Sequence, residues 1–318
     1  MVRPWILYAG LAACAPELPD ETSIVTTPRL LGVQLEPPEV APQTAVATRA
    51  LWVDADGVIA DAPLAWAFCT ARKGLTEPGP IASACLAETS DQLVPFGDGT
   101  TATGNVPPTA CRQFGPDAPD PLPGEPAGRP VDPDSTGGFY QPIRVRASDP
   151  IESYILGEVR ITCGLPSATP AQSMEFRERY VRNANPTIEA MVGTDGAALV
   201  TSETDASASS QVAAGSSIDL AAHWPACASA PCGGSEPYAW FDPRARVLVE
   251  RREAMRVSWF ASGGAFARGH SGRTEDDVAT FATTTWTAPT TPGSHYVWIV
   301  LRDDRGGTTW ATVRFAVE

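Results

Sequence analysis

Short runs rich in valine, isoleucine, threonine and aromatic residues, several of them alternating between apolar and polar positions, recur along most of the chain between prolines and glycines. In the first half these runs span residues 29–35, 44–53, 64–69, 143–146 and 154–163. In the second half they span residues 216–222, 255–262, 279–286, 294–301 and 308–317. Alternation predicts half-buried β-strands, and many short strands between turns predict sandwiches or barrels. We therefore expect a mainly β protein with two β-sandwich regions.

One stretch between the two regions carries helix signals instead. Thr169 is placed to cap a helix, Pro170 occupies the favoured first position, and Gln172 completes a capping box. Phe176 and Tyr180 are four residues apart, so they share a helix face, and we interpret them as packing residues. The sequence predicts a helix over residues 170–182, within a short helical connector that spans 166–194.

Two segments have little periodicity and much of the proline and glycine. Residues 70–139 are expected to form a long loop inserted in the first sandwich, and residues 225–253 a second insertion. A structureless loop of the first length is uncommon in a compact domain unless something holds it in place. Within the first segment, Asp132 and Asp134 form a carboxylate pair for which the sequence offers no partner.

The order of motifs in both regions resembles bacterial immunoglobulin-like domains of the PKD type. The first region has a strand, a proline-rich corner, a second strand, the Asp-Gly turn at 54–57, and a strand that carries Trp66. The second region resembles the family more closely, through the motifs VSWF at 257–260, WTAP at 286–289, PG at 292–293, VWIVLRD at 297–303 and GG at 306–307. The resemblance implies Ig-like sandwiches at 29–165 and 195–318. It also implies a module that binds, spaces or presents, without catalysis of its own.

The first residues read as an export signal. Arg3 precedes a short apolar run at residues 5–11, which is shorter than a membrane-spanning helix. Leu11-Ala12-Ala13-Cys14 resembles the bacterial lipobox, in which the cysteine is acylated and becomes the first residue of the mature protein. The resemblance implies a signal peptide at 1–13 and a lipid on Cys14. It also implies attachment to the cell envelope, at the outer membrane of a Gram-negative bacterium. Residues 14–28 are polar and contain proline, so we expect a tether.

Charge and composition narrow the range of partners. The formal net charge is −14, which argues against a nucleic-acid partner. Pro 31 and Gly 27 exceed average usage, yet they fall short of the composition of a disordered chain.

Seven cysteines divide into one lipid acceptor and six disulfide partners. Six is an even number, and export favours disulfides. Cys227 and Cys232 bracket a short loop and are expected to form one local bridge. The other four cysteines allow three connectivities. Cys69 and Cys163 are expected on strands separated by another strand, about 9–10 Å apart, which is too far for a disulfide. We therefore prefer Cys69–Cys85 with Cys111–Cys163.

No catalytic or metal-binding motif emerges from the sequence. The three histidines are scattered, and no nucleophile elbow or phosphate-binding loop occurs. Asp54, Asp56 and Gly57 share features with part of a calcium loop, but the Glu expected at its end is missing, so a hairpin turn is preferred. We interpret Asp303, Asp304, Gly306 and Gly307 as a turn in the same way. The sequence predicts no catalytic residue, no metal site and no cofactor.

These observations predict a non-enzymatic, lipid-anchored structural, presenting or binding module of the bacterial cell envelope. Its expected partners are the membrane, through Cys14, and a protein or glycan of the envelope. Two alternatives stay open: an accessory of a carbohydrate- or peptide-processing enzyme with a site in loop 70–139, and a calcium-stabilised adhesin.

Overall fold

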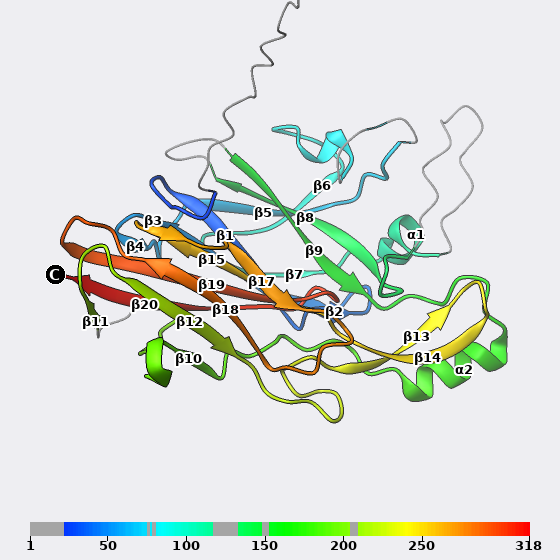
Figure 1. The fold of residues 1–318 in the computed structure, drawn as a ribbon. Helices are drawn as coiled ribbons and strands as arrows, with labels where there is room; N and C mark the ends of the chain where they lie inside the picture. Colours follow the sequence, from blue (N-terminus) through cyan, green and yellow to red (C-terminus); the bar gives the residue numbers. More distant parts are fainter. Residues whose placement is uncertain (1–21, 75–76, 78–80, 117–132, 148–152, 204–208) are drawn as a thin grey trace, which may run out of the picture.

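The computed structural model describes residues 22–74, 77, 81–116, 133–147, 153–203 and 209–318. Nearly all of its regular structure is β, arranged in two sandwiches (Figure 1), so the predicted fold class is confirmed. Cys14 and the predicted signal peptide lie outside the described residues.

The first sandwich packs a four-stranded sheet against a five-stranded one. The four-stranded sheet contains β1 (Arg29–Glu36), β3 (Ala45–Asp54), β4 (Gly57–Val58) and β7 (Thr101–Asn105). The other has the order β2 (Glu39–Val40), β9 (Ser153–Ile161), β8 (Phe139–Ala147), β5 (Leu64–Cys69) and β6 (Leu93–Asp98). Trp52, Trp66, Phe68 and Ile143 fill the core between them.

The second sandwich repeats this arrangement with its own two sheets. One has the order β11 (Ser209–Val212), β20 (Thr308–Val317), β19 (Gly293–Asp303), β15 (Met255–Ala261) and β17 (His270–Arg273). The other has the order β10 (Ala190–Val192), β12 (Ser217–His223), β18 (Phe281–Thr287) and β16 (Ala265–Phe266). Trp259, Trp286 and Phe315 lie in the core between them.

The two sandwiches stack face to face and share a third apolar layer. Leu51 and Val53 of β3 point away from their own core and pack against Trp298 and Val300 of β19. Alternation explains the geometry: in β19, residues 297, 299 and 301 face the second core, while 296, 298 and 300 face the first sandwich. A strand buried on both faces reads as a continuous apolar run, and Tyr296 to Leu301 is such a run.

The connector and the second insertion form an arm beside the sandwiches (Figure 1). Helix α2 (Pro170–Arg179) begins at the predicted capping box of Thr169 and Gln172, and it ends three residues before the predicted boundary. It lies against the hairpin of β13 (Pro237–Asp242) and β14 (Val247–Arg252), which belongs to the segment expected as insertion 225–253. A short 3-10 helix η2 (Thr194–Gly196) follows β10.

The segment 70–139 is not loop throughout. It contains the 3-10 helix η1 (Ser83–Cys85), strands β6 and β7, and helix α1 (Ala110–Phe114). The run from Leu93 to Asn105 has little apolar alternation, and most of it is exposed or half-buried. Its strands follow from pairing with β5 and β3 and not from an apolar pattern of their own.

Residues 22–28 belong to the fold, although the sequence assigns them to a tether. Val25 is fully buried in the layer between the sandwiches. Its amide donates to Ala261 O at 2.8 Å, and the Ala261 amide donates to Ser23 O at 2.9 Å. Ser23 to Val25 therefore continue a sheet of the second sandwich before the chain enters β1.

The charge cluster between the two sandwiches

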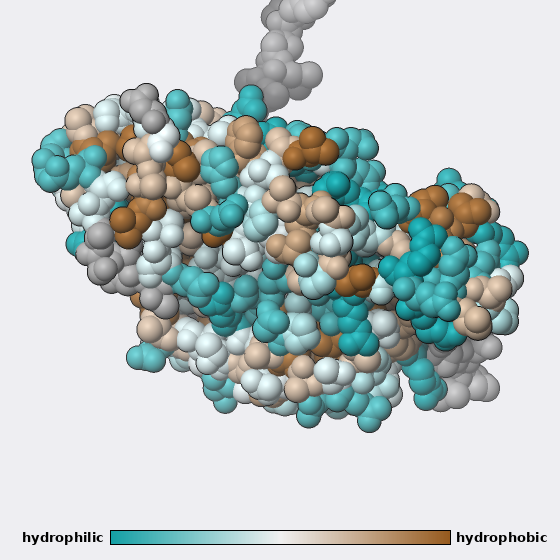
Figure 2. All heavy atoms as spheres, turned by 90° about the horizontal axis from the view of Figure 1, so that it is seen from below, coloured by the Kyte–Doolittle hydropathy of each residue, from teal (hydrophilic) through white to brown (hydrophobic). Residues whose placement is uncertain are grey.

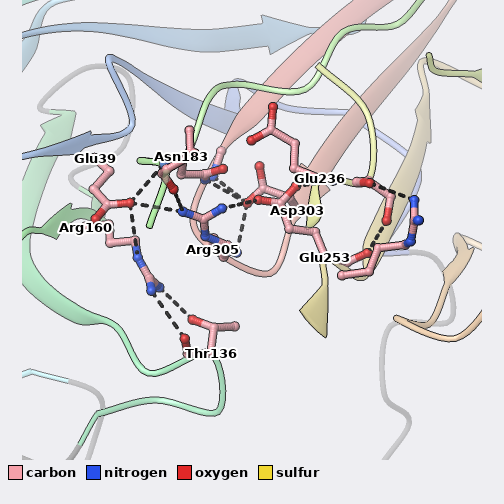
Figure 3. Close-up of polar contacts among 12 residues, drawn as sticks. Glu39, Thr136, Arg160, Asn183, Glu236, Glu253, Asp303 and Arg305 are labelled. Atoms are coloured by element: carbon pink, nitrogen blue, oxygen red, sulfur yellow. Dashed lines mark hydrogen bonds and ion pairs between the residues drawn. The ribbon is translucent and has the colours of Figure 1, made fainter. Parts of the chain in front are cut away.

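Six buried charged side chains meet where the two sandwiches and the connector come together (Figure 3). All of them are between 0% and 7% exposed: Glu39, Arg160, Glu236, Glu253, Asp303 and Arg305. The first two belong to the first sandwich, and the other four to the second. Buried ionic groups need charged or hydrogen-bonded partners, so the contacts of each one define the site.

Arg305 lies at the centre and contacts carboxylates from both sandwiches. Its Nη1 is 3.1 Å from Glu253 Oε1, and its Nη2 is 3.3 Å from Glu39 Oε2. Nη2 also donates to Val181 O of the connector at 2.8 Å. One guanidinium group therefore joins three parts of the chain.

The turn between β19 and β20 positions Arg305. Asp303 Oδ1 accepts from the amides of Arg305 and Gly307, each at 2.8 Å, and so closes the turn. Gly306 has φ +102, and a Cβ there would lie 3.5 Å from the Tyr140 ring of the first sandwich. The turn predicted at Asp303 to Gly307 is present, but the burial of Asp303 could not be read from its turn-like surroundings in the sequence.

Glu39 and Arg160 form the half of the cluster that the first sandwich contributes. Arg160 Nε is 3.5 Å from Glu39 Oε2. Arg160 Nη1 donates to Thr136 Oγ1 at 2.6 Å and to the Tyr140 hydroxyl at 2.9 Å. Asp134 supports this group because its Oδ1 accepts from Thr136 N and its Oδ2 accepts from the Tyr140 hydroxyl, both at 2.9 Å. The expectation that Asp134 has no partner is wrong; Asp132 lies outside the described residues.

The connector enters the cluster through Tyr180 and Asn183. The Tyr180 ring stacks on Phe176 with centroids 4.5 Å apart, as expected of packing residues. Its hydroxyl also donates to Glu39 Oε2 at 2.7 Å and accepts from Arg305 Nη2 at 3.0 Å, a role that helical spacing could not reveal. Burial raises the pKa of Tyr180, so the hydroxyl keeps its proton. Asn183 donates from its amide to Glu39 at 2.9 Å and from Nδ2 to Asp303 at 3.1 Å.

Glu236 and Glu253 connect the cluster to the Cys227–Cys232 loop. The Cys232 amide donates to Glu236 Oε1 at 2.6 Å, and the Glu236 amide donates to Glu253 Oε2 at 3.0 Å. Burial raises the pKa of Glu253 well above its usual value, and nearby Asp303 adds to the effect. Burial also raises the pKa of Asp303, to about 6.

A cavity of about 320 Å³ opens beside the cluster, between the sandwiches. Its wall combines leucines of β1 and β9 with Asp134, Glu158, Arg302 and Asp304. Burial and the charge of Asp134 raise the pKa of Glu158. Segment 70–139, in which the alternative hypothesis places an enzyme-accessory site, contributes Asp134 alone to this lining among its described residues.

The structure brings together all six cysteines that were expected to form disulfides. The bonds are Cys69–Cys85, Cys111–Cys163 and Cys227–Cys232, with Cα atoms 5.6, 5.6 and 5.8 Å apart. The first two fasten segment 70–116 to β5 and to the end of β9.

The Asp54 to Gly57 segment forms a hairpin turn, in which the Asp56 amide donates to Asp54 Oδ1 at 2.9 Å. Across the described ranges, no three His, Cys, Asp or Glu side chains are grouped as metal ligands. Nor does any helix in those ranges have the length and apolar character to cross a membrane.

No protein-family model matches the chain, and no curated protein matches its sequence. Solved structures resemble it only loosely. The Escherichia coli adhesin FdeC is 12% identical over 91% of this chain, with a TM-score of 0.19. The Yersinia pseudotuberculosis adhesin InvE is 12% identical over 92%, with a TM-score of 0.21, and murine CEACAM1b is 11% identical over 90%, with 0.21. The chain spans 66% and 60% of the two adhesin chains and all of the CEACAM1b chain. At these TM-scores the likenesses carry no argument, so function rests on the residues of this chain.

Proposed function

We propose that this protein is a lipid-anchored, non-enzymatic module of the bacterial envelope that holds two β-sandwiches as one rigid unit and presents them to a protein or glycan partner. The observation that carries the proposal is that the buried charges connect the two sandwiches. Arg305 and its partners join the first sandwich, the connector and the second sandwich.

The apolar layer supports the same conclusion. Leu31, Leu51, Val53, Trp298 and Trp310 are buried where the sheets meet, so hinge motion would expose large apolar side chains. Polar contacts at the edges of this layer fix the register: Arg302 donates to Leu31 O at 2.7 Å and Asn185 donates to Leu35 O at 2.7 Å. A module whose domains are held in this way suits spacing and presentation.

Residues 23–25 are hydrogen-bonded to the second sandwich, and this limits the distance between the folded part of the protein and an anchor at Cys14. Only residues 15–21 would lie between the lipid and the described fold. A fully extended chain spans about 3.3–3.6 Å per residue, so the body would stay within about 30 Å of the acylated cysteine. The proposed module would therefore act close to the membrane surface.

The surface in Figure 2 fits a module of this kind. Hydrophilic and hydrophobic residues are mixed over that face, and the hydrophobic ones gather in small separate patches. Val247 and Val249 of the β13–β14 hairpin and Met174 of α2 are among the exposed apolar residues of the arm. Isolated apolar residues of this kind are ordinary for a protein surface.

The anchor is tested by expressing the full chain in a Gram-negative host with labelled palmitate. The wild type is expected in the membrane fraction and labelled, and Cys14→Ser in the soluble fraction and unlabelled. The double variant Cys227→Ser/Cys232→Ser is the matched control, because it removes two cysteines and should stay membrane-bound. Membrane attachment and labelling of Cys14→Ser would contradict the anchor.

The presenting role is tested separately on intact cells. Photo-crosslinking from exposed Val247 or Val278 should join the anchored protein to a defined envelope protein or glycan. Hydrolysis of envelope glycans or peptides by the purified protein would contradict a non-enzymatic role.

A further inference from the structure

The buried cluster contains more negative than positive groups. Four carboxylates, Glu39, Glu236, Glu253 and Asp303, stand against the two guanidinium groups of Arg160 and Arg305, and all are at least nine-tenths buried. Burying one unpaired charge is costly by several kcal/mol even after relaxation. If all four carboxylates are ionised, their excess negative charge therefore destabilises the closed cluster.

The contacts show which carboxylates lack a cation. Glu39 contacts both arginines, and Glu253 contacts Arg305. Asp303 and Glu236 accept hydrogen bonds from backbone amides and, for Asp303, from Asn183. One oxygen of each, Asp303 Oδ2 and Glu236 Oε2, is buried and has no hydrogen-bond partner in the described part of the chain. The Asp303 oxygen is a place for a proton.

We propose that the cluster is a proton-operated latch, which holds the two sandwiches together more firmly in acidic than in neutral solution. The proton is taken up at Asp303, whose Oδ2 has no partner in the described part of the chain, and its uptake removes one of the two excess charges. The latch is distinct from the presenting role proposed above, and either can fail without the other.

Every element packed around Asp303 and Glu253 contributes to the balance. Arg305 faces them from the β19–β20 turn, Glu236 from the segment before β13, and Asn183 from the connector. The Tyr238 ring of β13 lies 4.7 Å from the Arg305 guanidinium carbon. On the other side of Arg305, its guanidinium group contacts Glu39 and Tyr180, and Glu39 in turn contacts Arg160. None of these groups is a histidine, so the response comes from carboxylates.

The sign follows from linkage. The pKa of Asp303 is about 6 in the folded protein and near 3.8 when unfolded, so the folded state binds more protons between these values. Stability then falls as pH rises through this window, by at most about tenfold in the folding equilibrium per pH unit for one proton. Burial also raises the pKa of Glu253 well above its ordinary value, so this carboxyl group acts in the same direction.

The first test is hydrogen exchange of the full chain between pH 4 and 7, corrected for the intrinsic rate. Peptides over residues 180–186 and 302–308 should lose protection by about tenfold or more as pH rises, since one bound proton changes an equilibrium by that factor per pH unit. A peptide over β18, inside the second sandwich, should change little. Equal protection of the latch peptides at both pH values would overturn the proposal.

Variants assign the effect to the cluster. Asp303→Asn can keep the oxygen that accepts from Arg305 and Gly307, and it cannot ionise, so it should flatten the pH profile. Glu253→Gln provides a second, independent variant if the first does not fold. Asp61→Asn is the matched control, because Asp61 is exposed and distant in sequence from every member of the cluster. A profile that both cluster variants leave unchanged would contradict the latch.

A measurement on the unmodified protein separates protons from other cations. Difference titration of the native and urea-unfolded chain should show extra protons bound to the native state between pH 4 and 6. The exchange profile should be the same in sodium, potassium and calcium salts at constant ionic strength. Protection that follows the cation and not the pH would mean that the excess charge holds a metal ion, and the proton latch would be wrong.

Discussion

Arg305 shows how one side chain can hold two domains together. Its two terminal nitrogens contact carboxylates from opposite sandwiches, and its position depends on the turn closed by Asp303. Breaking a buried ion pair from one side leaves a buried carboxylate without its partner, which is more damaging than the loss of an exposed pair. Single substitutions in the cluster should therefore lower the free energy of unfolding much more than substitutions of exposed ion pairs.

Arg305→Met is expected to lower the free energy of unfolding by about 3–5 kcal/mol, because Glu253 keeps its burial and loses its cation. Urea denaturation at pH 7 measures the change. Arg179→Met is the control, since Arg179 forms an exposed pair with Glu175 at 2.9 Å on α2. Equal losses for the two variants would show that the cluster does not contribute as described.

Tyr180→Phe keeps the ring and removes the hydroxyl that bonds Glu39 and Arg305. The expected loss is about 1–3 kcal/mol, the usual range for leaving buried partners unsatisfied. Phe176→Leu, compared in the same denaturation experiment, removes the stacking partner and leaves the hydroxyl in place. A larger loss for Phe176→Leu would assign Tyr180 a packing role alone.

Elements differ in how far the sequence could predict them. Helix α2 was predictable because Thr169, Pro170 and Gln172 specify its start locally. Strands such as β19 were predictable from their apolar residues, whereas β6 and β7 depend on partner strands that are distant in sequence. The cluster was missed for the same reason: Glu39, Arg160 and Arg305 lie far apart in the chain, and each resembles an ordinary surface charge until the fold brings them together. The unbroken apolar run from Tyr296 to Leu301 is typical of a strand buried on both faces, and it is the trace that this interface leaves in the sequence.

The disulfides should differ in their effect on stability according to the chain length they enclose. Cys111–Cys163 closes a separation of 52 residues, and replacing both cysteines with serine is expected to cost about 4 kcal/mol. Cys227–Cys232 closes a separation of 5 residues, for an expected loss of about 2 kcal/mol. Thermal denaturation of the two double variants gives the order, and the reverse order would mean that strain or the Glu236 contact dominates.

At the scale of the whole molecule, the sheets form four successive layers with three apolar interfaces. We expect the middle interface to make the two sandwiches unfold as one unit. Calorimetry of the wild type is expected to show a single transition, because neither sandwich can unfold without exposing the shared layer.

Trp298→Ala should split that transition in two. Trp298 is fully buried between the sandwiches, and its truncation is expected to cost about 3–5 kcal/mol. Trp259→Ala removes an equally buried ring inside the second sandwich and should lower the transition temperature without splitting the peak. A single peak for Trp298→Ala would show that the charge cluster alone couples the sandwiches.

The pairing of the segment 23–25 with the second sandwich has a mechanical consequence. If Cys14 carries the anchor, a pulling force on the body passes first through the hydrogen bonds between this segment and Ala261 of the second sandwich. It reaches β1 of the first sandwich only afterwards. Tension from the membrane would thus act first on the pairing between residues 23–25 and Ala261. The second sandwich, which is farther from the anchor along the chain, would bear the load before the first sandwich does.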